Sequence, residues 1–412
     1  MGQDGRASFA EQVATLREQA GLSLAEVAAV AHVARGHVHN IEHGRRWPSQ
    51  GVVKALDGAL NAGGALLATW EAADALPKTA AAPADPEDRE RVTLAARQPR
   101  RVDAATVGAL AEVLAAIRRL EDQVGSAAVL PGVRNHRALA CSLLADARGP
   151  VRDRVGALAG ELHHYLGWLL AETRHFEAAQ RELDAALALG VEFDDPDLTS
   201  LALSYKGYLA WMLDDSQGAI TLSRAAHRDE RVFVAQHAYN TYQEARGWAM
   251  VGERAEVDRL LGRADELAER AVARQADAPP NMYWYSSGFF TLQRGLTWHT
   301  LGDPRVAQRA ATELINGLHE MPDAERDSEW AAIFTVAAAE AFTTAGDAEL
   351  ALAHACQALV VCRATRSTRL AGALQRAHTQ MRDTWPTHAA VRELGDELRN
   401  CAMAESSRAR RG

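Results

Sequence analysis

Cationic and hydrogen-bonding side chains gather in residues 32–47. This stretch holds three arginines and four histidines against a single acid, Glu42. An arginine such as Arg35 can donate two parallel hydrogen bonds to a guanine edge, and an asparagine such as Asn40 can pair with adenine or bind a phosphate. The stretch is therefore a local basic face with side chains suited to nucleic-acid contacts.

The basic face belongs to an acidic chain. The 412 residues include 45 Lys and Arg against 54 Asp and Glu, which gives a net charge of −9. That balance excludes a uniformly basic nucleic-acid coat protein, so any nucleic-acid contact must be local. A chain of this length has room for two or three folding units.

Short helices are expected to hold the basic face in place. The first has an apolar face made of Phe9, Val13, Leu16 and Ala20. Gly21 can end this helix in the left-handed conformation. Ser23 and Glu26 have the spacing of a capping box, in which each side chain bonds the backbone of the other, and this predicts a second helix from Leu24.

The next two helices complete a small core. Ala28 leaves room for a close crossing between the second and third helices. The third helix is expected to begin after Ala34, to turn Val38 and Ile41 inward, and to end at Gly44. A fourth helix follows the break at residues 47–48.

These segments resemble the helix-turn-helix of the XRE class, the Cro and phage-repressor type. The matching residues read LREQAGLSLAEVA and VARGHVHNIEHGRRWPS. The resemblance implies a five-helix, repressor-like domain whose third helix enters the major groove of double-stranded DNA. The residues that this resemblance places toward DNA are Arg35, Gly36, His37, His39 and Asn40. Arg45 and Arg46, just past the helix, are expected to contact backbone phosphates.

Three positions in this domain differ from a simple DNA-contact pattern. Glu42 is expected to cap the helix or pair with Arg45 or Arg46, because a carboxylate near phosphates is repelled. Leu24 stands where the family often has a phosphate-bracing Gln. His32 stands at a turn where the family often has Gly.

The rest of the chain is expected to be helical as well, which makes the fold all-α. Prolines and charges in residues 77–101 predict a flexible linker after the DNA-binding domain of residues 1–76. Residues 102–150 are expected to form amphipathic connecting or capping helices. The apolar face that begins at Val107 could pack within the chain or pair two protomers.

A helix, turn and helix pattern recurs from residue 151 onward. Its turns centre on Arg174, Asp214, Gly252, Gly302 and Gly346, and each is followed by a small or branched residue. The intervals exceed the roughly 34 residues of a regular tetratricopeptide repeat. The segment nevertheless resembles that family, which implies a tetratricopeptide-like α-solenoid over residues 151–412.

A DNA-binding head joined to such a stack resembles the peptide-pheromone receptors of Gram-positive bacteria. This implies a homodimer controlled by a peptide or small-molecule effector. The effector residues suggested for the concave surface are Lys206, Asn240, Gln243, Tyr283, Tyr285, Gln293 and Arg294. The tyrosines belong to an aromatic segment that could equally serve as packing between repeats.

Several other classes are not favoured by the sequence. The four cysteines form no C-x-x-C pair and suggest neither a metal site nor disulfides. No phosphate-binding loop or nucleophile elbow occurs, so no enzyme, catalytic residue or cofactor is expected. No apolar run approaches membrane-spanning length, which predicts a cytoplasmic protein that does not contact membranes. The alternative function is a protein-interaction scaffold that does not bind DNA.

Overall fold

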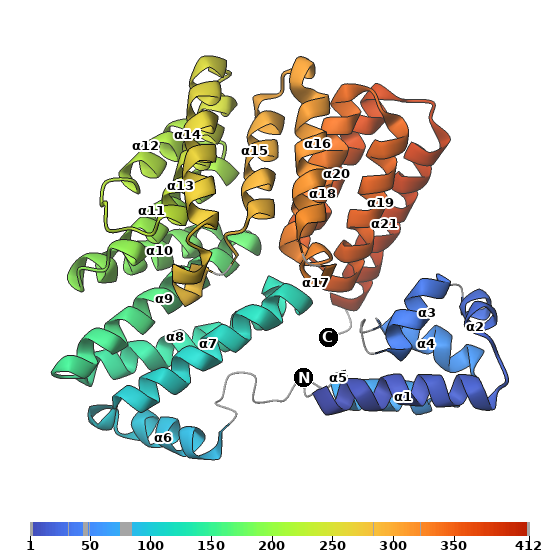
Figure 1. Cartoon of the computed structure of the whole chain (residues 1–412), viewed down its shortest axis with the longest axis horizontal. Helices are drawn as coiled ribbons and strands as arrows, with labels where there is room; N and C mark the ends of the chain where they lie inside the picture. Colours follow the sequence, from blue (N-terminus) through green and yellow to red (C-terminus); the bar gives the residue numbers. More distant parts are fainter. Residues whose placement is uncertain are drawn as a thin grey trace. The chain divides into compact units, whose positions relative to one another are not determined.

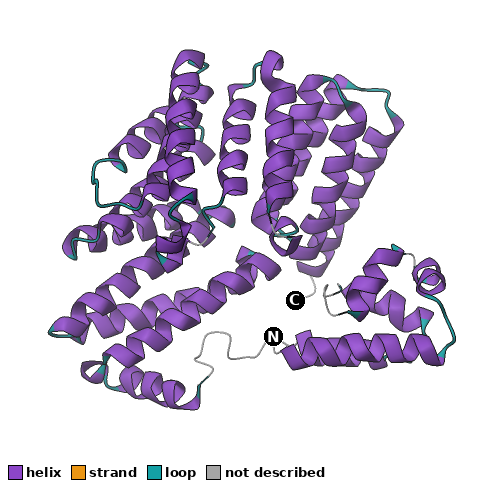
Figure 2. Cartoon of the chain, viewed as in Figure 1, coloured by secondary structure: helices purple, strands orange, loops and turns teal. Residues whose placement is uncertain are grey.

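A computed structural model describes residues 3–31, 33–43, 48, 50–74, 85–282, 284–321 and 323–409. Throughout these residues the only regular secondary structure is helical (Figure 2). The chain divides into two compact units, residues 1–80 and 81–412. The all-α expectation is therefore confirmed, and each unit is described by itself.

The first unit contains five helices. They are α1 (Gln3–Gln19), α2 (Leu24–Val30), α3 (Arg35–Glu42), α4 (Gln50–Ala59) and α5 (Ala65–Asp74). Their apolar side chains meet in one core, which includes Phe9, Val13, Val38, Ile41 and Leu56. Burying these side chains is what fixes the short helices against one another.

Local signals set the boundaries of α2 as expected. Gly21 has a φ of +65°, the left-handed conformation that few other residues adopt readily. The Ser23 N–H donates to Glu26 Oε2 at 2.8 Å, and the Glu26 N–H donates to Ser23 Oγ at 3.3 Å. The capping box is therefore present. The small residue Ala28 is buried where α2 packs on its neighbours.

The expectation of a continuous linker over residues 77–101 is wrong for its second half. Residues 86–97 form α6 (Pro86–Arg97), followed by the 3-10 helix η1 (Pro99–Arg101). Asp85 caps α6 by accepting from the Glu87 N–H at 2.7 Å, and Pro86 occupies the first helical position. Ala95 is buried in the same core as α7 and α8, so this segment is packed. Proline here marks a helix start rather than a flexible stretch.

Two long helices, α7 (Ala104–Val124) and α8 (Ser126–Asp146), lead into the stack. Val107, Leu110, Leu114 and Ile117 of α7 are buried in a core shared with α8 and α9. Of the two alternatives for this face, the structure shows packing within the chain. Arg118 and Glu121 of α7 are also buried.

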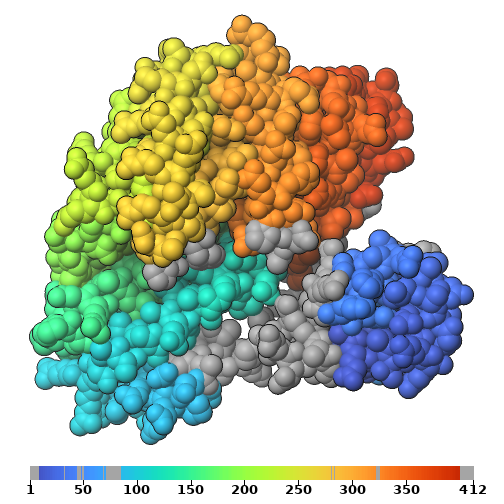
Figure 3. All heavy atoms as spheres, viewed as in Figure 1, coloured from blue at the N-terminus to red at the C-terminus, as the bar shows by residue number. Residues whose placement is uncertain are grey.

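Six helix pairs follow in chain order, as Figure 1 shows by the colour change from green to red. The pairs are α9 (Pro150–Glu172) with α10 (Phe176–Glu192), α11 (Pro196–Met212) with α12 (Ser216–Ala225), α13 (Val234–Met250) with α14 (Arg254–Val272), α15 (Ser287–Leu301) with α16 (Pro304–Glu320), α18 (Glu329–Ala345) with α19 (Ala348–Thr365), and α20 (Thr368–Thr384) with α21 (Ala389–Ala409). Three short elements, η2 (Gln275–Asp277), η3 (Pro280–Met282) and α17 (Asp323–Arg326), lie between pairs. Successive helix pairs lie against one another in the space-filling view (Figure 3).

The turns within the pairs follow the predicted pattern. Arg174, Asp214, Gly252, Gly302 and Gly346 all have positive φ values between 59° and 85°. The small or branched residues after the turns are all buried, and they are Ala179, Ala219, Val257, Ala307 and Ala351. Small side chains at these positions allow the two helices of each pair to approach closely.

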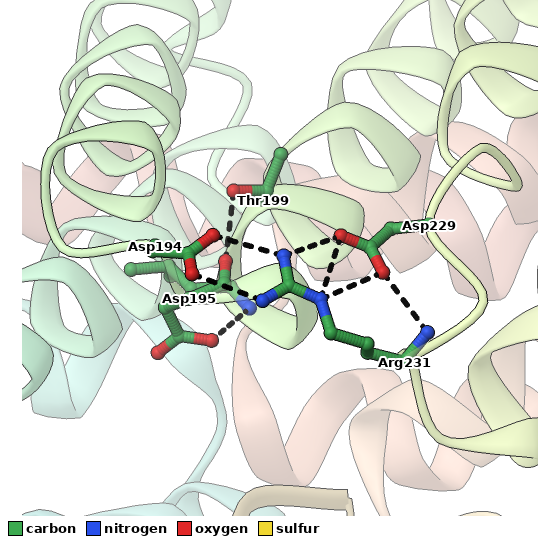
Figure 4. A network of polar contacts seen from close by, with 6 residues as sticks. Asp194, Asp195, Thr199, Asp229 and Arg231 are labelled. Carbon is green, nitrogen blue, oxygen red and sulfur yellow. Dashed lines mark hydrogen bonds and ion pairs between the residues drawn. The ribbon is translucent and has the colours of Figure 1, made fainter.

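Polar contacts join neighbouring pairs at their loops. In Figure 4 the Arg231 guanidinium lies between Asp194, which follows α10, and Asp229, which follows α12. Its Nη1 and Nη2 donate to the two Asp194 carboxylate oxygens at 3.0 and 2.9 Å. Bidentate pairs of this kind fix orientation as well as distance. Asp195 and Thr199 start the next helix beside this network.

Within the described part of the chain, no helix is both long enough and apolar enough to cross a membrane.

Candidate functional site

The exposed face of α3 is the candidate site, and the spacing of its residues produces it. An α-helix turns 100° per residue, so positions 35, 36, 39, 40 and 43 share one side. Val38 and Ile41 lie on the opposite side and are buried. Burial of those two residues therefore leaves the other side of α3 turned away from the core.

The structure brings four of the five expected helix residues together on that face. Arg35 and Gly36 are exposed, and His39 and Asn40 are half-buried. His37 lies beside the core positions instead, and its Nε2 is buried. A side chain in that position is less available to DNA than the other four. Arg45 and Arg46, expected to contact phosphates, lie outside the described residues, as does His32.

His43 belongs to the same face, although it was not among the expected DNA contacts. It is exposed, and its ring centroid lies 4.1 Å from that of His39. The His43 Nδ1 is 2.8 Å from the His39 carbonyl oxygen. The spacing of residues 35, 39 and 43 could have identified it, because residues four apart on a helix are neighbours.

The carboxylate of Glu42 is bound by a residue that sequence reasoning missed. Arg17 of α1 donates from Nε to Glu42 Oε1 at 2.7 Å and from Nη2 to Oε2 at 3.1 Å. Hydrogen bonding to Glu42 raises the pKa of Arg17. The expectation of an ion pair for Glu42 is correct in kind, and the partner among the described residues is Arg17. The pair neutralises the one acid in the basic stretch.

Comparison with known proteins agrees with the geometry of this unit. Residues 8–70 match the family model described as a helix-turn-helix domain. No curated protein and no solved structure matches the chain. The first unit therefore contains a helix-turn-helix domain, and the resemblance of the second unit to tetratricopeptide proteins rests on its helix pairs alone.

The six suggested effector residues that the structure describes do not line one cavity. Asn240 and Gln243 are buried and bonded internally, since Asn240 Nδ2 donates to Ser200 Oγ at 3.1 Å and Gln243 Nε2 donates to Ser204 Oγ at 2.6 Å. Tyr285 is buried and its hydroxyl donates to the Gln236 side chain, which fits the packing alternative for the aromatic segment.

The other suggested residues are also separated. Lys206 pairs with Asp184. Arg294 pairs with Glu313 at 2.9 Å and with Asp265 at 3.3 Å. Tyr283 lies outside the described residues. Of the six that the structure describes, Gln293 lines an aromatic cavity of the second unit.

Proposed function

We propose that this chain is a sequence-specific transcriptional regulator of the cytoplasm that binds DNA as a homodimer under the control of a ligand of its helical repeat unit. The observation that carries the proposal is the exposed face of α3 within the matched helix-turn-helix domain. Arg35 and Asn40 supply base-reading groups there, and the exposed Gly36 permits a close approach of the backbone. The chain then acts by binding rather than by catalysis.

Selection of bound fragments tests the proposal directly. The full-length protein would be mixed with fragmented genomic DNA, and bound fragments would be recovered and sequenced at two salt concentrations. We expect a shared sequence motif, with affinity that falls steeply as salt rises because phosphate contacts release counterions. Well-folded protein that enriches no sequence motif even at low salt would contradict the proposal.

A homodimer also predicts the spacing of the DNA half-sites. A symmetric pair of helix-turn-helix domains binds two half-sites about 34–36 Å apart, one turn of DNA, or a multiple of this spacing. The apolar face of α7 is already buried within the chain, so another surface must join the protomers. Footprinting would reveal paired half-sites, and sedimentation would give the number of protomers.

The scaffold alternative predicts a different result from the same material. A scaffold would keep its cellular activity when the α3 face is neutralised, whereas a DNA-binding regulator would lose it. Reporter expression from a selected site, compared between wild type and an Arg35→Ala, His43→Ala double variant, separates the two functions.

A further inference from the structure

The second unit contains a cavity of about 110 Å³. Side chains of α7, α9, α11, α13, α15, α18 and α20 line it, so nearly the whole length of the stack contributes. Two contacts between distant parts of the chain hold its sides together. The Ser126 N–H donates to Glu329 Oε2 at 3.0 Å, and Arg369 pairs with the buried Glu172. The cavity is therefore a product of the curved stack and of no single repeat.

Aromatic rings dominate the wall of this cavity. Tyr205 stands among them, with ring centroids 5.7 Å from Trp168 and 6.5 Å from Tyr239. Trp168, Tyr205 and Trp211 are only half-buried by protein, so part of each ring remains available. Flat apolar surfaces of this kind favour a ligand that carries its own ring.

Arg246 supplies a buried positive charge on the same wall. It is 2% exposed and its guanidinium carbon lies 4.9 Å from the Trp211 ring centroid. Its Nη2 donates to Gln293 Oε1 at 3.0 Å. Gln293 is a neutral amide, and the other side chain that hydrogen-bonds Arg246 is the neutral Tyr239, so none of the ion pairs of the described residues involves Arg246. A buried cation without an anion is costly, so this position is suited to an anionic ligand.

The other two arginines of the wall show the contrast. Arg118 pairs with Glu161, and Arg369 pairs with Glu172. Both charges are thus compensated by the protein itself. Arg246 differs from them because its hydrogen-bond partners among the described residues, Gln293 and Tyr239, are both neutral.

The acids of the wall do not replace the missing anion. Burial raises the pKa of Glu121 to about 8, and burial also raises the pKa of Glu325. The Glu121 carboxyl group is therefore biased toward its neutral form, and the third acid, Asp122, is on α7 beside Glu121. A cationic ligand would meet Arg246 without a compensating charge, so the electrostatics favour an anion over a cation.

We propose that the cavity binds a small aromatic carboxylate, with its carboxylate paired to Arg246 and its ring stacked against the tyrosine and tryptophan side chains. The cavity is smaller than an engineered apolar cavity of about 150 Å³ that binds benzene, so it limits the ligand to a single ring with its carboxylate. An extended peptide is disfavoured because the amides of Asn240 and Gln243 are already bonded inside the protein. The inference rests on the proposed function for the role of this ligand as the effector.

Direct binding to the full-length protein tests the inference without DNA. The probes are benzoate and phenylacetate, each compared with its neutral amide, which preserves the ring and the size. Tryptophan fluorescence is a suitable signal because Trp168, Trp211, Trp284 and Trp330 line the cavity. We expect at least one acid to bind, and its amide to bind about tenfold more weakly or worse, since a buried charge pair is lost.

Variants locate the binding. Arg246→Met preserves most of the side-chain volume and removes the charge, and we expect it to weaken acid binding about tenfold or more while leaving amide binding unchanged. Arg392→Met is the matched control, because Arg392 is an exposed arginine on α21 far in sequence from the cavity residues. Circular dichroism checks folding, and Trp211→Leu gives a second route to the same answer if Arg246→Met fails to fold.

Every outcome bears on the inference. Equal binding of acid and amide, unchanged binding in Arg246→Met, or no binding of either acid overturns it. Protein that selects a DNA motif but binds neither acid leaves the proposed DNA-binding function intact. Protein that binds an acid through Arg246 but selects no DNA supports the cavity and removes the proposed function.

Discussion

Arg17 and Glu42 form a bidentate ion pair that joins α1 to the last residue of α3. The same guanidinium donates from Nη1 to the Leu22 carbonyl oxygen at 3.2 Å, in the turn before α2. One side chain therefore binds the two ends of the helix-turn-helix segment. This contact helps to fix the angle at which α3 presents its exposed face.

Loss of this pair is expected to loosen the first unit. The Glu42 side chain is 5% exposed, so Glu42→Ala leaves a partly buried guanidinium without its anion, at a cost of about 2 kcal/mol. Hydrogen exchange of peptides from residues 3–74 in the full-length protein measures the effect. Glu18→Ala is the control, because Glu18 also contacts Arg17, at 3.6 Å, but is 72% exposed. Equal protection in the two variants would contradict a structural role for the pair.

DNA binding is expected to depend on Arg35. Arg35→Ala should weaken binding to a selected site by about 1–3 kcal/mol and relax the preference at one base position, as loss of a base-reading arginine does. Arg392→Ala removes the same charge from an exposed position on α21 and should leave the affinity and the motif unchanged. Fluorescence anisotropy with the selected site and single-base variants measures both. A uniform loss across all base variants would reassign Arg35 to phosphate contact.

Much of the first unit could be predicted because its signals are local. Gly21, Ser23 and Glu26 act within a few residues of one another, and their roles follow from spacing alone. The buried positions of α3, Val38 and Ile41, follow from helical periodicity. The same is true of the turns of the second unit, where a residue of positive φ precedes a small buried one.

The features that could not be predicted depend on contacts between distant residues. Arg17 is 25 residues from Glu42, and nothing near either residue indicates the pairing. Arg118 and Glu121 have the spacing of a solvated face, yet the curved stack buries both. The cavity around Arg246 draws on helices from α7 to α20, so its lining forms only once these helices are packed. The helix at residues 86–97 was missed because proline was read as a sign of flexibility.

Glu121 is expected to make the second unit less stable as pH rises. Burial raises its pKa from 4.5 to about 8, although the Ser126 hydroxyl that donates to it at 2.7 Å opposes the shift. The neutral form is thus favoured in the folded state. The neutral carboxyl group contributes fully to the free energy of unfolding below pH 4.5. This contribution is lost as the pH rises through about 8, by up to about 1.4 kcal/mol per pH unit.

Glu121→Gln should remove this dependence, since an amide of the same shape does not ionise. Melting of wild type and variant would be compared from about pH 5 to about pH 9, the window in which linkage acts. We expect the wild type to lose melting temperature relative to the variant across this range. Curves that stay parallel would show that Glu121 does not ionise differently in the folded and unfolded states.

Cys141 is expected to be the most reactive of the three described thiols. Its Sγ lies 3.3 Å from His163 Nε2, and His163 Nδ1 lies 2.6 Å from Glu182 Oε2. The hydrogen bond with His163 lowers the pKa of the Cys141 thiol. Burial opposes the charged imidazole, but the bonds to Cys141 and Glu182 raise the pKa of His163 to about 9. By contrast, burial raises the pKa of Cys356, and Cys362 is buried.

Alkylation by iodoacetamide, followed by residue-resolved mass spectrometry, tests this ranking. The thiolate is the form that attacks iodoacetamide. Each unit by which the thiol pKa is lowered raises the alkylation rate roughly threefold at a pH below that pKa, because the larger thiolate fraction is partly offset by lower nucleophilicity. At neutral pH, Cys141 should therefore react faster than Cys356, even though Cys356 is the more exposed of the two. His163→Gln should slow Cys141 and shift its rate profile to higher pH, while leaving Cys356 unchanged. If Cys141 kept its rate in this variant, the imidazole would not be the group that activates the thiol.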